Sequence, residues 1–357
     1  MANQKKTDYI CISKESEGPA PDTLDETLPG KIQGNVGFLL LVLMESSIID
    51  KFFSFLRFSI GTAASVPVMS YQELKVIHAL SRKQALLGVM LGGLQRMGEA
   101  AVTVRPEEND AYGQLIMKWV GEGAVIARQN KKVDADVAGL FTDLNEIGFE
   151  CCLLKGQGNA RLYPRPEERT SGDIDVWVRP KREKREGSAK EQKRDIMEVI
   201  SLAKDADPSA RAIYHHVEYL PHEGTEVELH YRPQFMSGFR HNAKLQRYFR
   251  EHADAQFSHK LLMEGHMIAV PTWEFNVVSQ TSHIFKHLFH EGIGLRQLMD
   301  YFYLLTSVGE ARKSEYLCKA VLKRLGLKEI AGALCWILVE KFGMEERYSV
   351  FTTPFGE

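Results

Sequence analysis

Residues 153–156, Leu-Leu-Lys-Gly, and residues 169–178, Arg-Thr-Ser-Gly-Asp-Ile-Asp-Val-Trp-Val, decide the fold of this chain. In the second segment an aspartate alternates with apolar residues. A strand with this pattern turns Asp173 and Asp175 to one face and the intervening apolar side chains to the other. Paired carboxylates are typical ligands of Mg²⁺ or Mn²⁺ in phosphoryl transfer. The segment therefore predicts a strand that carries a divalent-metal site.

A third carboxylate is expected on a neighbouring strand. Residues 226–231, Glu-Val-Glu-Leu-His-Tyr, alternate in the same way, so that Glu226, Glu228 and His230 share one face. Glu228 has apolar neighbours on both sides and is the preferred candidate, with Glu226 as its replacement. Three carboxylates this close repel one another, so we expect them to need a cation. The predicted catalytic and metal-binding set is Asp173, Asp175 and Glu228.

The turn after the first apolar segment predicts a phosphate contact. Gly156 and Gly158 permit close approach of the backbone to a phosphate. The side chains of Lys155 and Arg169 can neutralise charge on a leaving pyrophosphate. The alternative for these two cations is a plain ion pair with the acidic cluster.

The order of these motifs resembles the bacterial "uncharacterised nucleotidyltransferase" family, a branch of the polymerase-β-like nucleotidyltransferase superfamily. The resemblance extends from about Val133 onward and departs from the superfamily in its turn, which lacks the usual Gly-Ser or Gly-Gly. It rests on Leu154-Lys155-Gly156, Tyr163-Pro164, Arg169, Asp173-Ile174-Asp175, Glu228-Leu229-His230, His283-Ile284-Phe285-Lys286-His287 and residues 292–300.

The resemblance implies a nucleotidyltransferase that moves a nucleoside monophosphate from a nucleoside triphosphate, with ATP expected, to an acceptor hydroxyl. A small molecule or a protein is favoured over nucleic acid as the acceptor. Two other functions stay open: a catalytically silent, antitoxin-like regulator that binds nucleotide or protein, and a helical scaffold. The residues expected to bind the nucleotide are Lys155, Gly156, Gln157, Gly158 and Arg169.

Periodicity predicts an α+β fold in which a small mixed β-sheet is embedded between helical regions. The expected regions are a flexible leader (1–30), an N-terminal helical region (31–130), the catalytic core (131–235) and a C-terminal helical region (236–357). Strands are expected at 149–154, 173–178, 214–220 and 226–231, with a hairpin turn at 221–225. Helices are expected at 37–60, 71–97 (capped by Ser70), 111–128, 133–147, 194–206, 273–291, 295–308, 314–326 and 328–342.

Composition excludes several classes of protein. The chain has 357 residues, 44% of them hydrophobic, and a net charge of −2, which gives no general attraction to nucleic acid or to an anionic membrane. Its five cysteines lack metal-ligand spacing, and no signal peptide is recognisable, so we expect a cytoplasmic protein. The apolar run 36–44 is too short to span a membrane and is expected to form a buried helix.

Three further patterns have more than one interpretation. His283, His287 and His290 share a helical face and allow a zinc site, a role in the cleft, or plain packing. Arg296 and Asp300 are one turn apart, which favours an intrahelical ion pair over a substrate contact. The basic run 181–194 has no interleaved aromatic residues, so it is expected to be a solvated loop that leads into a helix.

Overall fold

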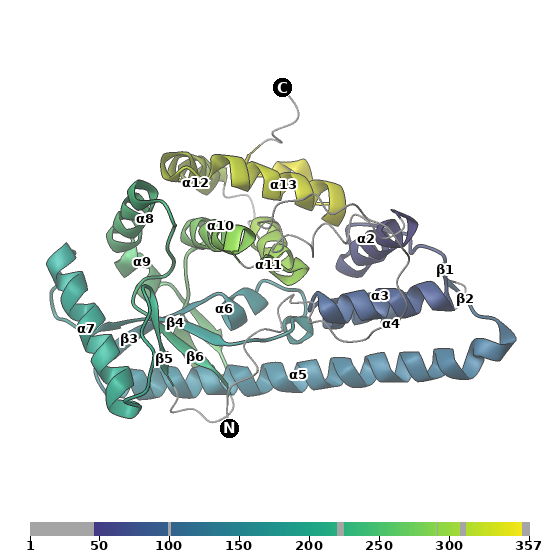
Figure 1. Ribbon diagram of the computed structural model, residues 1–357, viewed down its shortest axis with the longest axis horizontal. Helices are drawn as coiled ribbons and strands as arrows, with labels where there is room; N and C mark the ends of the chain where they lie inside the picture. Colours follow the sequence, from purple (N-terminus) through teal and green to yellow (C-terminus); the bar gives the residue numbers. More distant parts are fainter. Residues whose placement is uncertain (1–45, 99–100, 220–224, 291, 308–311, 352–357) are drawn as a thin grey trace, which may run out of the picture.

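The computed structural model describes residues 46–98, 101–219, 225–290, 292–307 and 312–351 (Figure 1). The fold is α+β, as predicted: helices from both ends of the chain surround a small sheet. The described elements are α2 (Ser46–Ile60), β1 (Met69–Ser70), α3 (Tyr71–Lys83), α4 (Leu87–Arg96), β2 (Val102–Thr103), η2 (Pro106–Glu108), α5 (Asn109–Glu146), β3 (Phe149–Leu154), α6 (Gly156–Ala160), η3 (Pro166–Glu168), β4 (Ile174–Pro180), α7 (Ala189–Ala206), β5 (His216–Tyr219), β6 (Val227–His230), α8 (Phe239–Glu251), α9 (Ala253–Ser258), β7 (Lys260–Met263), β8 (His266–Ala269), α10 (Trp273–His290), α11 (Leu295–Thr306), α12 (Arg312–Leu325), α13 (Lys328–Phe342) and η4 (Glu346–Tyr348).

The four predicted strands form one mixed sheet in the order β3-β4-β6-β5. Strand β4 is antiparallel to β3 and parallel to β6, and β5 is antiparallel to β6. The register pairs Asp175 with Glu228, which confirms that the third carboxylate lies on the strand beside the aspartate strand. The predicted hairpin turn lies outside the described residues, except for Thr225.

Both faces of the sheet are covered, and the alternation along β4 assigns its side chains to different faces. Ile174 and Val176 belong to the core under α5 and α7, together with Val137 and Val199. Trp177 faces the other way and stacks on Phe275 of α10, with ring centroids 5.7 Å apart. Asp175 shares the face of Trp177, so the carboxylates lie on the side that α10 covers.

Helix α5 is one continuous helix of 38 residues, where the sequence predicted two. It runs along the length of the molecule, from α3 and α4 to the sheet (Figure 1). Asn130 lies where the break was expected, but its amide group donates to the carbonyl oxygens of Glu167, at 2.9 Å, and Arg169, at 2.6 Å. These tertiary bonds hold the asparagine inside the helix. The predicted stop is confirmed, because Gly148 follows the helix with φ of +90°.

The segment predicted as one helix over 71–97 is broken into α3 and α4. Ser70 begins α3 with a capping box, as predicted. The break follows Lys83, where Ala85 has φ of +55°. There Oε1 of Gln84 accepts from the backbone N–H of Leu295, at 3.0 Å, at the start of α11. A contact with a distant element thus accompanies the interruption, and no local signal predicts it.

The remaining predicted helices are confirmed as α7 and α10–α13, with α7 beginning earlier than expected. One continuous cluster of buried apolar side chains joins α2–α4 with α10–α13, and includes Leu56, Leu74, Met90, Tyr301 and Leu338. None of the described helices has the length and apolarity that a bilayer crossing requires. The expected helix at 36–44 lies outside the described residues.

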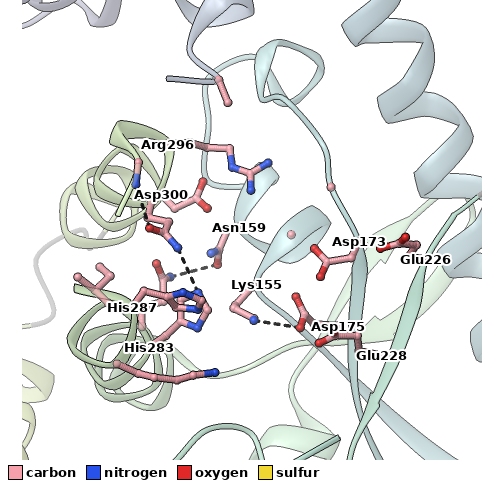
Figure 2. Close-up of a pocket in the computed structure, with 18 of the residues that line it drawn as sticks. Lys155, Asn159, Asp173, Asp175, Glu226, Glu228, His283, His287, Arg296 and Asp300 are labelled. Atoms are coloured by element: carbon pink, nitrogen blue, oxygen red, sulfur yellow. Dashed lines mark hydrogen bonds and ion pairs between the residues drawn. The ribbon is translucent and has the colours of Figure 1, made fainter. Parts of the chain in front are cut away.

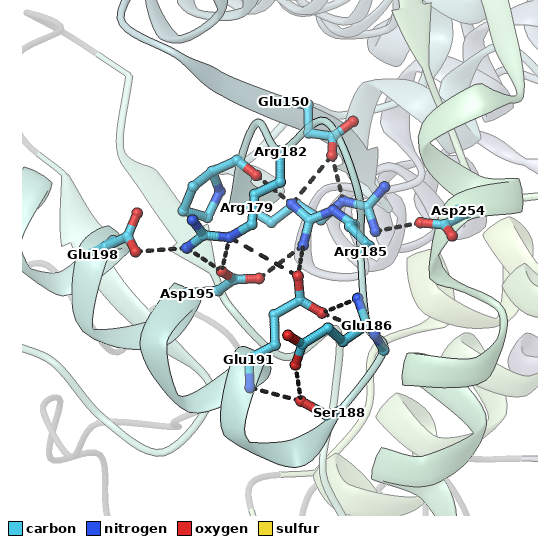
Figure 3. A network of polar contacts seen from close by, with 12 residues as sticks. Glu150, Arg179, Arg182, Arg185, Glu186, Ser188, Glu191, Asp195, Glu198 and Asp254 are labelled. Carbon is cyan, nitrogen blue, oxygen red and sulfur yellow. Dashed lines mark hydrogen bonds and ion pairs between the residues drawn. The ribbon is translucent and has the colours of Figure 1, made fainter.

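The basic run after β4 is not simply a solvated loop, because two of its arginines turn back into the fold (Figure 3). Arg182 and Arg185 both bind the buried carboxylate of Asp195 on α7, at 2.8 and 2.9 Å. Arg185 also reaches Glu150 of β3 at 3.3 Å. These arginines serve the packing of α7 against the sheet.

Gly88→Ala and Gly121→Ala form a matched pair that tests how closely α4 approaches η3. A Cβ at Gly88 would lie 2.3 Å from the carbonyl oxygen of Glu168, whereas a Cβ at Gly121 meets nothing within 4 Å. We expect Gly88→Ala to lower the free energy of unfolding by about 1–3 kcal/mol through overpacking. Gly121→Ala, in an exposed helix interior, should raise it by about 0.5–1 kcal/mol. Urea unfolding measures both; equal stabilities would contradict the close approach.

Candidate active site

A cavity of about 830 Å³ lies between the sheet and the helices α10 and α11 (Figure 2). The sheet contributes the carboxylates Asp173, Asp175 and Glu228. The opposite wall carries His283 and His287 from α10, together with residues from the start of α11. The predicted acidic residues and the histidine helix thus face the same space.

Asp175 and Glu228 lie at the centre of a buried polar cluster. Nε2 of His230 is 2.8 Å from Oδ1 of Asp175 and 3.4 Å from Oε2 of Glu228. The ligand atoms of these three residues lie within 4.8 Å of one another. Two carboxylates and one imidazole at this spacing fit the coordination shell of a divalent cation.

Lys155 supplies the positive charge nearest to this cluster. Its Nζ lies 2.9 Å from Oδ1 of Asp175. The residue has φ of +49°, a left-handed conformation that costs a non-glycine residue about 1–3 kcal/mol. The turn between β3 and α6 thus holds the ammonium against the carboxylates with a strained backbone.

The expected repulsion between the carboxylates acts on both aspartates, but it raises the net pKa of only one of them. Burial raises the pKa of Asp175, but Lys155 and His230 outweigh it, so this pKa lies below the usual value. Burial likewise raises the pKa of Glu228, and hydrogen bonds with His216 and His230 outweigh it. Asp173 differs: repulsion from Asp175, together with burial, raises its pKa to about 6. Lys155 and the neighbouring imidazoles therefore outweigh burial at two of the three carboxylates.

The turn residues expected to bind nucleotide do not all reach the cavity. Lys155 and Gly156 line it. Gln157 points towards α5, where its Nε2 donates to Oδ1 of Asp134 at 2.6 Å. Gly158 faces inwards, against the carbonyl oxygen of Leu153. Only the first two residues of this turn are thus in a position to meet a phosphate in the cavity.

Arg169 lines the cavity, but its guanidinium takes part in a buried ion pair, so its phosphate role stays a prediction. Nε and Nη2 of Arg169 donate to the two carboxylate oxygens of Asp300, at 2.8 and 2.9 Å. Tyr163 donates to the same carboxylate at 2.7 Å. Arg296, the expected partner of Asp300, donates to the carbonyl oxygen of Thr170 at 3.0 Å. The pair ties α11 to the segment that leads into Asp173.

Two of the three predicted histidines of α10, His283 and His287, lie close together but are not part of a metal-ligand cluster among the described residues. The rings of His283 and His287 are 4.2 Å apart, and Nδ1 of His283 accepts from Gln234 at 2.7 Å. The side chain of His290 lies outside the described part of the structure. Among the described residues, neither His283 nor His287 belongs to a group of three close ligands.

Sequence reasoning missed several residues of the site. The alternation along 226–231 predicts the correct face for His230 but indicates no role for it. His215 and His216 come from the edge of the sheet, and Asn159 and Gln280 from α6 and α10. The face shared by Glu226, Glu228 and His230 is the only sequence signal that could have indicated His230. The others depend on tertiary packing.

The family model described as "Uncharacterised nucleotidyltransferase" matches residues 73–343. No curated protein matches the chain. Among solved structures, the chain is similar to the crystal structure of an antigenic nucleotidyltransferase-like protein from Paracoccidioides brasiliensis. That similarity has a TM-score of 0.34 and 13% identity, and covers 60% of this chain and 94% of the other.

Asp300→Asn tests the pair that anchors the loop before Asp173. Removing one partner leaves the buried guanidinium of Arg169 uncompensated, so we expect a loss of about 3–5 kcal/mol in the free energy of unfolding at neutral pH. Burial raises the pKa of Asp300, but Arg169 and Tyr163 outweigh it and hold the pKa below its usual value. The ion pair therefore contributes its full stability above about pH 4, the pKa of this carboxyl in the unfolded chain. That stability is lost as the pH falls below this value.

Denaturant unfolding between pH 7 and pH 3 measures this effect. The difference between parent and Asp300→Asn should shrink in acid. Glu345→Gln is the control, because Glu345 pairs with Arg347 at 2.8 Å on the exposed surface, where a pair contributes less than about 1 kcal/mol. Equal losses in the two variants would contradict the assignment.

Proposed function

The chain belongs to the family of uncharacterised nucleotidyltransferases, and we propose that it is a metal-dependent enzyme of this type. It transfers a nucleoside monophosphate from a nucleoside triphosphate, with ATP as the expected donor, to an acceptor hydroxyl and releases pyrophosphate. The observation that carries the proposal is the pairing of Asp175 with Glu228 on adjacent strands, at one wall of a cavity of about 830 Å³. Small-molecule sites occupy about 300–1,000 Å³.

Mg²⁺ or Mn²⁺ is the proposed cofactor, held by Asp173, Asp175 and Glu228. The donor chemistry fits, because hard divalent cations prefer carboxylate oxygens and tolerate an imidazole such as that of His230. A bound cation supplies charge neutralisation at the reacting phosphate.

The chain's own cations are proposed to bind the phosphates. Lys155 already lies beside Asp175, and Lys286 and Arg296 line the same cavity. Cations held in fixed positions stabilise the charge that develops on a leaving pyrophosphate. Arg169 does not touch the substrate in this proposal: it positions the segment before Asp173 through its pair with Asp300.

The acceptor is proposed to bind against α10 and α11, opposite the carboxylates. That wall offers Gln280, His287 and Gln297 as hydrogen-bonding side chains. A small molecule or a protein hydroxyl is the preferred acceptor, because a net charge of −2 gives no general attraction to nucleic acid. The four described cysteines are free and buried, which agrees with a reducing compartment such as the cytoplasm.

One observation favours a second candidate, the catalytically silent regulator. The ammonium of Lys155 contacts Asp175 where a cation would bind, and the strained turn holds it there. A protein that uses this lysine in place of a metal could bind nucleotide without turnover. Binding of ATP without release of pyrophosphate would distinguish this candidate, and binding of neither metal nor nucleotide would favour a scaffold.

Asp175→Asn tests the proposed enzyme. The substitution keeps the size of the side chain and removes one charge from the metal site, so transfer of label from α-labelled ATP to acceptors in a cell extract should fall by a factor of about 10² or more. The parent should also gain more thermal stability from Mg²⁺ and ATP than the variant does. Because Lys155 and His230 lose the negative charge that they contact, we expect the variant to melt below the parent in chelator.

Asp110→Asn is the matched control, since Asp110 is exposed in the first turn of α5. It should transfer label and respond to Mg²⁺ and ATP as the parent does. Undiminished transfer by Asp175→Asn, with the same ligand-induced stabilisation as the parent, would refute the metal-carboxylate assignment.

A further inference from the structure

Three buried imidazoles form a cluster beside Glu228, and two of them, His215 and His216, have no role in the proposed transfer. His215, 5% exposed, directly precedes β5; His216, 9% exposed, begins it; and His230, 1% exposed, ends β6. His216 and His230 are paired across the two strands. The three residues bring one ligand atom each to within 4.8 Å of one another. Imidazole clusters of this kind are typical ligands of Zn²⁺ and related transition metals.

The orientation of His230 is the one that a metal-bound imidazole adopts. Its Nδ1 lies 3.3 Å from the carbonyl oxygen of Arg232, an acceptor that holds the ring in place. Nε2 faces the carboxylates, 2.8 Å from Oδ1 of Asp175, so a metal that binds there takes the place of a proton. Metal-binding histidines donate their second ring N–H to a carbonyl or carboxylate in this way, which fixes the ring.

His215 is held in place by its backbone, while one of its two ring nitrogens has no hydrogen-bond partner among the described residues. Its carbonyl oxygen accepts from the backbone N–H groups of Tyr231, at 3.0 Å, and Arg232, at 3.2 Å. Within the described part of the chain, Nδ1 of His215 is buried without a partner. A buried polar atom in this state is costly unless something binds it.

We propose that His215, His216 and His230 bind a divalent transition-metal ion of the Zn²⁺ class, next to the carboxylate site. Oε2 of Glu228 is 2.8 Å from Nδ1 of His216 and 3.4 Å from Nε2 of His230, so this carboxylate lies between the two metal positions. It supplies negative charge to an ion that three neutral imidazoles would leave uncompensated. His215 and His216 also line the cavity, which gives the ion a route to its ligands.

The imidazole site differs from the carboxylate site in its choice of ion. Mg²⁺ takes oxygen ligands and gains little from nitrogen, whereas Zn²⁺ and Co²⁺ bind imidazole strongly. A large excess of Mg²⁺ therefore fills the carboxylate position and leaves the imidazoles to the transition metal. This difference in preference separates the two sites experimentally.

The test is a titration of the full chain, first freed of metals by a chelator that is then removed, with Co²⁺ in the presence of excess Mg²⁺. Cobalt substitutes for zinc and has visible absorption bands that report imidazole ligands and low coordination number. We expect one equivalent to bind with such bands and to be displaced by Zn²⁺. Absence of stoichiometric binding, or a weak spectrum typical of oxygen ligands alone, would overturn the proposal without any variant.

His215→Gln and His216→Gln each remove one imidazole, and we expect either to weaken Co²⁺ binding by a factor of about 10 or more. His287→Gln, on the opposite wall, is the matched control and should bind as the parent does. Thermal melts in chelator establish whether each variant is folded. If one of the two variants does not fold, the other is enough for the test. An unchanged affinity in a folded variant would overturn the proposal.

The titration needs no nucleotide, so its result is distinguishable from that of the transfer assay. Asp173→Asn removes a carboxylate that does not belong to the imidazole group. It should keep Co²⁺ binding while losing label transfer. Loss of Co²⁺ binding in Asp173→Asn, to the extent seen in His215→Gln, would place the ion on the carboxylates and overturn the separate imidazole site.

Discussion

The site depends on one constraint: two carboxylates lie side by side on a face of the sheet that helices cover. The pairing of β4 with β6 puts the buried Asp175 next to Glu228, which is partly buried. Such a pair persists only with positive charge at contact distance. The chain provides Lys155 from a strained turn and His230 from the same sheet, and both reach the carboxylates. Asp173, less well compensated, shows the remaining repulsion in its raised pKa.

The sheet could be predicted from the sequence because each of its strands carries a local signal. Alternation in 173–178 and 226–231 assigned the carboxylates to one face, and the observed register agrees. The helical regions were predicted from apolar periodicity in the same way. The predicted boundaries failed where a distant contact competes with local preference: Gln84 at the interruption between α3 and α4, and Asn130 inside α5.

The rest of the site depends on contacts between residues far apart in the chain. Asp300 binds the guanidinium of Arg169 although the two residues are 131 positions apart. Local sequence spacing therefore could not show that this arginine takes part in a tertiary ion pair. Gln157 follows the turn directly, yet the first turn of α6 rotates it towards α5. His216 reaches Glu228, and His215 reaches His230, only because an edge strand completes the sheet. These positions follow from tertiary geometry rather than from residue type.

The continuity of α5 has a mechanical consequence for the cavity. At 1.5 Å per residue, its 38 residues form a rod of about 57 Å. The amide group of Asn130, within this helix, also donates a hydrogen bond to the loop that carries Arg169. A hinge between the sheet and α3–α4 would have to bend the rod, and an unbroken ladder of hydrogen bonds resists this. The sheet that α5 supports from behind is thus held stiffly, and we expect any widening of the cavity for a bulky acceptor to come from the wall formed by α10 and α11.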